Sequence, residues 1–146
     1  INAYWRGTKK YHNAKIWVGV TQLPKPISIM EHALHTCRMT FFYDVAKEFP
    51  NPPWGVTANI CVINRTQNHI WFDHRYPKTG GGEDIDYCLR HKLILPYQDR
   101  MKCIVAVQDA LVYHPFWKSI LPQVAGWASG DVKCLEALPH STFYSF

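Results

Sequence analysis

The chain has 146 residues, a net charge of +5 and a hydrophobic content of 47%. A sequence of this length is about one domain, and this much apolar material excludes a wholly disordered chain. No apolar run approaches the roughly 18–20 residues that cross a bilayer, so we expect no membrane span in this segment. The densest basic cluster is Lys9, Lys10 and Lys15. We interpret it as a solvated surface, with an anionic ligand as the alternative, and we expect no nucleic-acid partner.

The cysteines and the chain ends bear on the compartment of the protein. Five cysteines, at positions 37, 61, 88, 103 and 134, are too far apart for a zinc knuckle. We expect most to be buried thiols, with one or two disulfides as the alternative. Asn64-Arg65-Thr66 is an N-glycosylation sequon, which has meaning only in the secretory pathway. The chain begins at Ile1 and ends in the aromatic run 142–146, and we expect both ends to be cut from a longer protein.

The first half of the chain predicts a strand and a helix. Residues 1–15 show no clear periodicity and predict irregular structure. The β-branched and aromatic run at 16–21 predicts a strand. Ser28 and Glu31 have the spacing of a capping box, and apolar residues at a helical period predict a helix over 29–47, ended by the prolines that follow.

The second half predicts further strands and helices. Residues 56–63 predict an extended segment, and 76–79 a turn. A helix is expected from Glu83 to about Arg90. Lys102–Tyr113 predicts two β-like pieces around Gln108-Asp109, and a helix from Lys118 to about Leu138 is expected to be interrupted at Pro122 and Gly130.

The strongest local signal is a glycine run followed by acidic residues. Gly80-Gly81-Gly82 allows positive φ angles and close approach to a ligand. Glu83, Asp84 and Asp86 then fall in the first turn of the predicted helix. A helix N-terminus favours negative charge by roughly 0.3–1 kcal/mol near the surface. We therefore expect these carboxylates to stay ionised, as a general base or cation ligand must be, with simple helix capping as the alternative.

Residues 55–90 carry a series of short motifs. They are Gly55-Val56-Thr57-Ala58-Asn59 with Asn64-Arg65, Trp71-Phe72-Asp73, and Gly81-Gly82-Glu83-Asp84-Ile85-Asp86 with Leu89-Arg90, followed later by Val112-Tyr113-His114-Pro115. In order and spacing the series resembles the glycosyltransferase family 2 domain, which has the nucleotide-sugar-binding GT-A fold. The Gly-Glu-Asp-x-Asp core is the specific part of the match. The resemblance implies an α/β domain with a mixed sheet and flanking helices, of which residues 1–146 form a single, partial, acceptor-side unit.

The resemblance also implies a reaction and roles for its residues. A sugar would pass from a nucleotide-sugar donor to an acceptor hydroxyl with inversion. Asp84 matches the acidic position that is the general base in inverting members, and Glu83 would bind the acceptor or share that role. His114 matches a histidine that helps hold Mn²⁺ or Mg²⁺ on the donor diphosphate, a core or rim histidine being the alternative. Asp86 is expected to support the helix turn.

Further residues are candidates for substrate binding. Aromatic faces suit the C–H faces of a sugar ring, although most tryptophans are core residues. Trp54 and Trp71 are the better candidates because they flank the matched segments. The other candidates are Asn59, Asp73, Gly81 and Gly82, with His69 and His74 as weaker ones for an acceptor groove. Because ligands gather beyond the carboxyl ends of strands in open α/β sheets, we expect Asp84, His114, Trp71 and Asp73 to face one cleft.

The chain departs from the family pattern in one respect. No Asp-x-Asp motif precedes residue 80, so we expect the donor-binding half to be absent from this segment. We expect either a fragment or an incomplete relative that does not bind a donor alone. A non-catalytic carbohydrate-binding or scaffold domain of the same fold is one alternative, and an unrelated basic α/β binding module is another. The parent protein could be tethered to a membrane. The Golgi or secretory lumen and the cytoplasmic face of a membrane are both possible locations.

The two histidines of Glu31-His32-Ala33-Leu34-His35 do not have the zinc-protease spacing, and we expect them on a helix surface.

Overall fold

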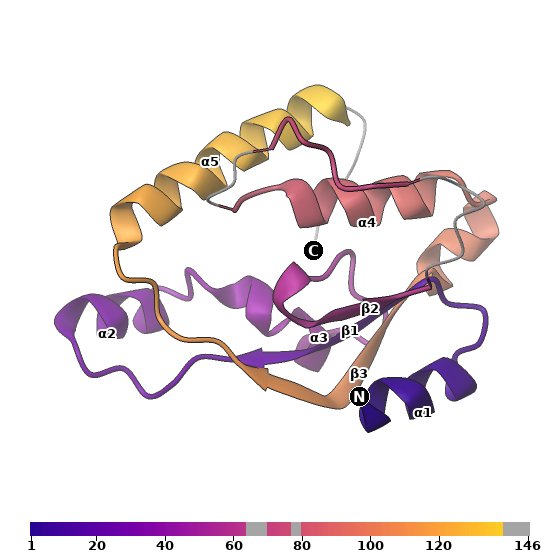
Figure 1. Ribbon diagram of the computed structural model, residues 1–146, viewed down its shortest axis with the longest axis horizontal. Helices are drawn as coiled ribbons and strands as arrows, with labels where there is room; N and C mark the ends of the chain where they lie inside the picture. Colours follow the sequence, from indigo (N-terminus) through magenta and orange to yellow (C-terminus); the bar gives the residue numbers. More distant parts are fainter. Residues whose placement is uncertain (64–69, 77–79, 139–146) are drawn as a thin grey trace.

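The protein is built around a three-stranded mixed sheet with helices on both faces, as the computed structural model shows (Figure 1). The central strand β1 (Ile16–Gln22) pairs antiparallel with β2 (Ile60–Val62) and parallel with β3 (Ile104–Tyr113). The predicted α/β class with a mixed sheet and flanking helices is therefore confirmed, as is the strand expected at 16–21. The structure describes residues 1–63, 70–76 and 80–138.

The central strand divides the core into two apolar clusters. Ile16, Val18 and Val20 point to one face of the sheet, and Trp17 points to the other. This alternation follows from the two-residue period of a strand. The first cluster is covered by α4 (Glu83–Leu93), and the second by α1 (Asn2–Lys10). Figure 1 shows α4 and α5 (Ile120–Ala137) on the opposite side of the sheet from α1.

Helix α1 corrects the expectation of irregular structure at 1–15. Gly7 is its only fully buried residue, and a Cβ there would lie 2.7 Å from Val107 Cγ2. The helix packs on the sheet through this close approach, with Ala3 and Tyr4 beside it. Ala3, Tyr4 and Gly7 recur at a helical spacing, so the sequence carried a short amphipathic pattern that the prediction overlooked.

The helix predicted over 29–47 is broken. It begins at the predicted capping box, in which Ser28 Oγ accepts from the Glu31 amide (3.2 Å) and Glu31 Oε2 accepts from the Ser28 amide (3.0 Å). However, α2 (Ile29–Thr36) ends early, Arg38 has φ of +50°, and helical structure returns only as a 3₁₀ turn at Phe41–Tyr43 and as α3 (Val45–Glu48). The break lets neighbouring aromatic residues of the turn join one cluster, whereas a regular helix would rotate them apart.

Strand β3 is one element with an irregularity, where the sequence predicted two pieces. Gly19 pairs with Val107 and the next residue, Val20, pairs with Leu111, so residues 108–110 are extra in the register. The Asn59 amide fills this bulge, because its Nδ2 donates to the carbonyl oxygens of Val20 and Ala110, both at 2.8 Å. Its Oδ1 lies 2.6 Å from the Tyr4 hydroxyl. Asn59, a predicted substrate-binding residue, is thus engaged inside the fold.

Helix α5 runs without the interruptions predicted at Pro122 and Gly130. Pro122 lies in the first turn, where helix amides have no intrahelical acceptor. Gly130 lies where the helix meets the turn at 80–82, and a Cβ on it would be 2.0 Å from the Gly81 carbonyl oxygen. A Cβ on Gly81 would likewise be 2.4 Å from the Gly126 carbonyl oxygen. The three turn glycines have φ of +83°, +131° and +83°, so the predicted positive φ angles are confirmed.

Other predictions have simpler outcomes. All five cysteines are free thiols, three of them buried, and the alternative of a disulfide is not realised. No helix in the described part of the chain is long and apolar enough to cross a membrane. His32 and His35 are exposed on α2. The sequon at 64–66 with its Asn64-Arg65 motif, His69, the turn residues 77–79 and the aromatic run 142–146 lie outside the described residues.

We expect Gly130→Ala to destabilise the protein by about 2 kcal/mol or more, as overpacking does. Helix propensity alone would favour alanine over glycine by about 1 kcal/mol, so the sign of the effect reports the contact with Gly81. Urea unfolding monitored by circular dichroism measures it. The matched control is Ser129→Ala on the exposed side of α5, expected within about 0.5 kcal/mol of wild type. A Gly130→Ala variant more stable than wild type would contradict the contact.

Candidate functional site

A cavity of about 430 Å³ lies beyond the carboxyl end of β3. Its volume is within the range of roughly 300–1,000 Å³ that is usual for small-molecule sites. Its walls are formed by residues from the 3₁₀ turn, the loop before β2, the glycine turn, α4 and α5, and from the segment after β3. They are Met39, Phe41, Phe42, Tyr43, Trp54, Val56, Thr57, Ala58, Gly80, Gly81, Gly82, Glu83, Asp84, Ile85, His114, Trp117, Gln123, Trp127 and Asp131.

The acidic residues at the start of α4 lie in this cavity. Gly82 is the N-cap and has no side chain to offer, so the carboxylates bond to the backbone instead. Glu83 Oε2 accepts from the Gly81 amide at 2.8 Å, and Asp84 Oδ1 accepts from the Ile85 amide at 2.9 Å. Glu83 is thereby tied back to the glycine turn. The capping interpretation and a role in the cavity are therefore compatible.

Burial, and after it the negative charge of Glu83, raise the pKa of Asp84 to about 7. The amides of Ile85 and Thr57 favour the charged form, but they do not compensate for the loss of water. This differs from the expectation that the helix N-terminus keeps the carboxylate ionised at neutral pH. Near pH 7 the Asp84 carboxyl is divided between its neutral and charged forms.

Aromatic side chains form the opposite wall. Trp127 meets Trp117 with ring centroids 5.0 Å apart at 86°, and it meets Phe42 at 5.3 Å and 75°. Tyr43 lies parallel to Trp117 at 6.1 Å, and Trp54 adjoins Phe42 at 6.4 Å. Burial, and then the charge of Asp84, raises the pKa of Tyr43. The electrostatic effect of Asp84 on Tyr43 shows that the acidic and aromatic walls are close to one another.

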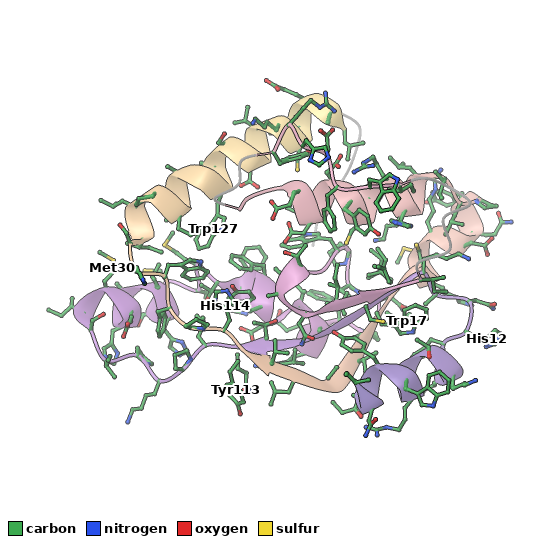
Figure 2. All side chains as sticks on the ribbon, in the orientation of Figure 1. His12, Trp17, Met30, Tyr113, His114 and Trp127 are labelled. Atoms are coloured by element: carbon green, nitrogen blue, oxygen red, sulfur yellow. The ribbon has the colours of Figure 1, made fainter. Side chains whose placement is uncertain are left out.

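His114 follows directly after β3, and its amide donates to the Gln22 carbonyl at 2.8 Å. Its ring packs beside the Tyr43–Trp117 pair, with centroids 5.5 Å from Tyr43 and 5.4 Å from Trp117. His114 Nδ1 is 2.7 Å from the Pro115 carbonyl oxygen. Because a carbonyl can only accept, Nδ1 is the donor, and Nε2 of the neutral ring keeps a free lone pair. In Figure 2, Trp127 points from α5 toward the region of His114, whereas Tyr113 points the other way.

The described residues do not form a complete metal site. Among them, no three His, Cys, Asp or Glu side chains are arranged to hold a metal ion. His114 offers one nitrogen ligand, and a full coordination shell for Mn²⁺ or Mg²⁺ would need further oxygen ligands, such as those of a bound diphosphate. The cavity residues would therefore supply only a small part of the coordination of such a metal.

Three predicted site residues do not line the cavity. Trp71 is 64% exposed, and its carbonyl accepts from Arg90 Nη2 at 2.7 Å. Hydrogen bonds from Arg75 engage Asp73 and hold the pKa of that carboxyl near 2. Asn59 spans the bulge in the sheet. The expectation that Trp71 and Asp73 share a cleft with Asp84 and His114 is thus not met, because the segment at 70–76 is held to α4 by Arg90 instead.

Asp86 has the supporting role that was expected for it. Its side chain is buried, and Arg90 Nε and Nη2 donate to its Oδ2 at 2.8 and 2.6 Å. Arg90 therefore connects α4 to the segment that carries Trp71. Asp86 does not line the cavity, so its charge stabilises the helix rather than the site.

The sequence interpretation did not name Gln123 and Asp131 and did not prefer Trp127, yet all three line the cavity. Gln123, Trp127 and Asp131 come from one face of α5, at intervals of four residues. Such spacing places side chains in one row on a helix, and that row adjoins Gly126 and Gly130, which contact the glycine turn. The period was a usable signal, but the sequence alone did not indicate which side of α5 faces the acidic turn.

Comparison with protein-family models, curated protein sequences and solved structures finds no match to this chain. The glycosyltransferase resemblance therefore stays a prediction from the motifs. The geometry of the cavity supplies the further argument on function.

We expect Asp84→Asn to stabilise the fold increasingly as pH rises. The folded pKa of Asp84 is about 7, above an unfolded value of about 3.9. Wild type therefore loses stability as pH rises from about 4 to about 7, because the unfolded chain releases this proton first. The variant lacks this loss, so its advantage should reach roughly 4 kcal/mol at pH 8, of which roughly 2–3 kcal/mol arises between pH 5 and pH 8.

Urea unfolding at pH 5 and pH 8 measures this difference. The matched control is Asp99→Asn, since Asp99 is an exposed carboxylate outside the cavity. It should show no gain between the two pH values. An Asp84→Asn effect of the same size at both would mean that Asp84 does not hold its proton in the folded protein.

Proposed function

We propose that this chain forms the acceptor side of an inverting glycosyltransferase with a GT-A-type fold, similar to glycosyltransferase family 2. The single observation that carries the proposal is the placement of Asp84. It combines a pKa of about 7 with a position in a cavity shared by Glu83, His114 and an aromatic wall. The motif series and the position beyond the carboxyl end of β3 support the same conclusion.

Asp84 is the proposed general base. Its Oδ1 accepts from the Ile85 amide, and the Thr57 amide also favours the charged form. A carboxylate has about four acceptor positions, so it can still take the proton of an acceptor hydroxyl. As that proton moves to Asp84, the acceptor oxygen attacks the anomeric carbon, and the nucleotide diphosphate leaves from the opposite face. A base of pKa near 7 accepts a proton more strongly than an ordinary carboxylate and is still partly ionised at neutral pH.

The remaining residues position the reactants. Glu83, tied to the Gly81 amide, adds negative charge that raises the proton affinity of Asp84. The aromatic wall offers ring faces for the C–H face of a sugar and excludes water from the base. Trp54 belongs to this wall, whereas the exposed Trp71 does not. His114 is proposed as a single protein ligand for a Mn²⁺ or Mg²⁺ ion that neutralises the leaving diphosphate.

A non-catalytic carbohydrate-binding role is the alternative that the same aromatic wall would serve. The two roles differ in their need for a titrating acid. Sugar binding by stacking does not require a carboxyl with a raised pKa, and burying one costs stability. The raised pKa of Asp84 therefore favours catalysis.

In the intact protein, we expect Asp84→Asn to lower kcat by about 10²–10⁴, the usual effect of losing a general base. Glu83→Gln should cost less, because Glu83 acts through Asp84. Transfer from radiolabelled UDP- and GDP-sugars to a panel of sugar acceptors measures both, with Asp99→Asn as the control. Near-normal turnover by Asp84→Asn would exclude it as the base. Wild-type protein that binds sugars but transfers none would favour the non-catalytic role.

The pH dependence provides an independent check. Only the ionised form of Asp84 can accept a proton, so kcat/KM should fall about tenfold per pH unit below about 7 and level off above it. The profile should be measured from pH 5 to 9 with a donor and acceptor that do not titrate in that range. A profile that is flat down to pH 5 would contradict a base with this pKa.

A further inference from the structure

The charge of the cavity is opposite to that of the chain. The chain carries a net charge of +5, yet Glu83, Asp84 and Asp131 all line the cavity. None of the described residues that line it is Lys or Arg. An anionic group would therefore meet carboxylates there, whereas a cationic group would be attracted.

The aromatic wall suits the same kind of ligand. Trp127 stands nearly perpendicular to both Trp117 and Phe42, with centroid separations of 5.0 and 5.3 Å. Both Trp117 and Trp127 line the cavity, so part of each ring is open to a ligand there. A ring face carries negative electrostatic potential and attracts an organic cation within about 6 Å of its centroid. Acidic and aromatic walls thus favour the same sign of charge.

The aromatic rings distinguish an organic cation from a metal ion. A hard divalent cation takes several oxygen ligands at once, and the described residues contain no group of three suitable side chains. An ammonium group, by contrast, needs only one or two carboxylates and is stabilised further by indole faces. The combination on these walls matches an ammonium group better than a bare metal ion.

We propose that the cavity binds a small hydroxyl compound that carries a positively charged amine, with the ammonium group between the carboxylates and the rings of Trp117 and Trp127. The binding of such an amine does not depend on catalysis. The further statement that the amine is the sugar acceptor rests on the proposed function, since Asp84 would then deprotonate the hydroxyl of the bound amine. The cavity volume of about 430 Å³ accommodates a compound of small-molecule size.

Two matched pairs of probes test the charge preference. Choline is compared with its uncharged carbon isostere, dimethylbutanol, and glucosamine with glucose, by ligand-observed NMR titration of the intact protein. We expect the charged member of each pair to bind at least about tenfold more tightly, with the preference weakening as salt is added. Equal affinity within both pairs, or no binding by either charged probe, would overturn the proposal.

Variants locate the binding. Trp127→Leu should remove most of the preference for choline over its isostere, Trp127→Phe should keep part of it, and Asp131→Asn should weaken it. Trp5→Leu on α1 replaces an exposed tryptophan away from the cavity, and should leave it unchanged. A preference that survives Trp127→Leu in a folded protein would place the cation elsewhere and contradict the proposal. If Trp127→Leu does not fold, a competition experiment in wild type replaces it. Glucosamine should displace choline, because both amines are proposed to bind the same site, and a failure to displace it would contradict the proposal.

The outcomes separate this proposal from the glycosyltransferase. Charge-selective binding without any sugar transfer would support the amine site and count against the proposed activity. Transfer to neutral acceptors without charge-selective binding would support the activity and overturn the amine site.

Discussion

The site depends on one close contact between two stretches of backbone. The glycine turn at 80–82 and the Gly126–Gly130 side of α5 approach so closely that a Cβ on Gly130 would be 2.0 Å from the Gly81 carbonyl oxygen. This contact fixes α5 against the start of α4. It therefore brings Trp127 and Asp131 to the same cavity as Asp84. Larger side chains at the contact would separate the aromatic wall from the acids.

The same contact explains why the glycines are needed. All three turn residues have positive φ angles, which glycine adopts without a steric cost. The sequence interpretation assigned this freedom to the approach of a ligand. In the structure, Gly81 and Gly82 do line the cavity, but the closest approach across them is to α5. Their main physical role is to position a helix.

The local elements of the fold could be predicted, whereas those set by tertiary contacts could not. The strand at β1, the capping box at Ser28 and the start of α4 follow from nearby residues. The break after α2, the bulge at 108–110 and the packing of α1 through Gly7 depend on contacts far apart in sequence. Asn59 illustrates this limit, since its amide bonds to Val20 and Ala110, neither of which is near it in the chain.

The site likewise combines residues that local motifs predicted with residues that only tertiary contacts bring there. Glu83, Asp84 and His114 were candidates from motifs, and the fold brings all three to one cavity, but the motifs carried no information on Tyr43 or Asp131. Nor did they predict the raised pKa of Asp84, because burial depends on the surrounding walls rather than on the helix N-terminus alone.

The two proposals are physically coupled through Asp84. Burial and the charge of Glu83 favour the protonated carboxyl. An ammonium group bound beside it would favour the ionised form and lower its pKa, as a nearby positive charge does. The buried charge then has a partner, which reduces its cost in stability. A cationic acceptor would thus help to create the base that reacts with it, and a neutral sugar of the same shape would leave more of Asp84 protonated. The acidic and aromatic walls would in this way contribute to selectivity in both binding and reactivity.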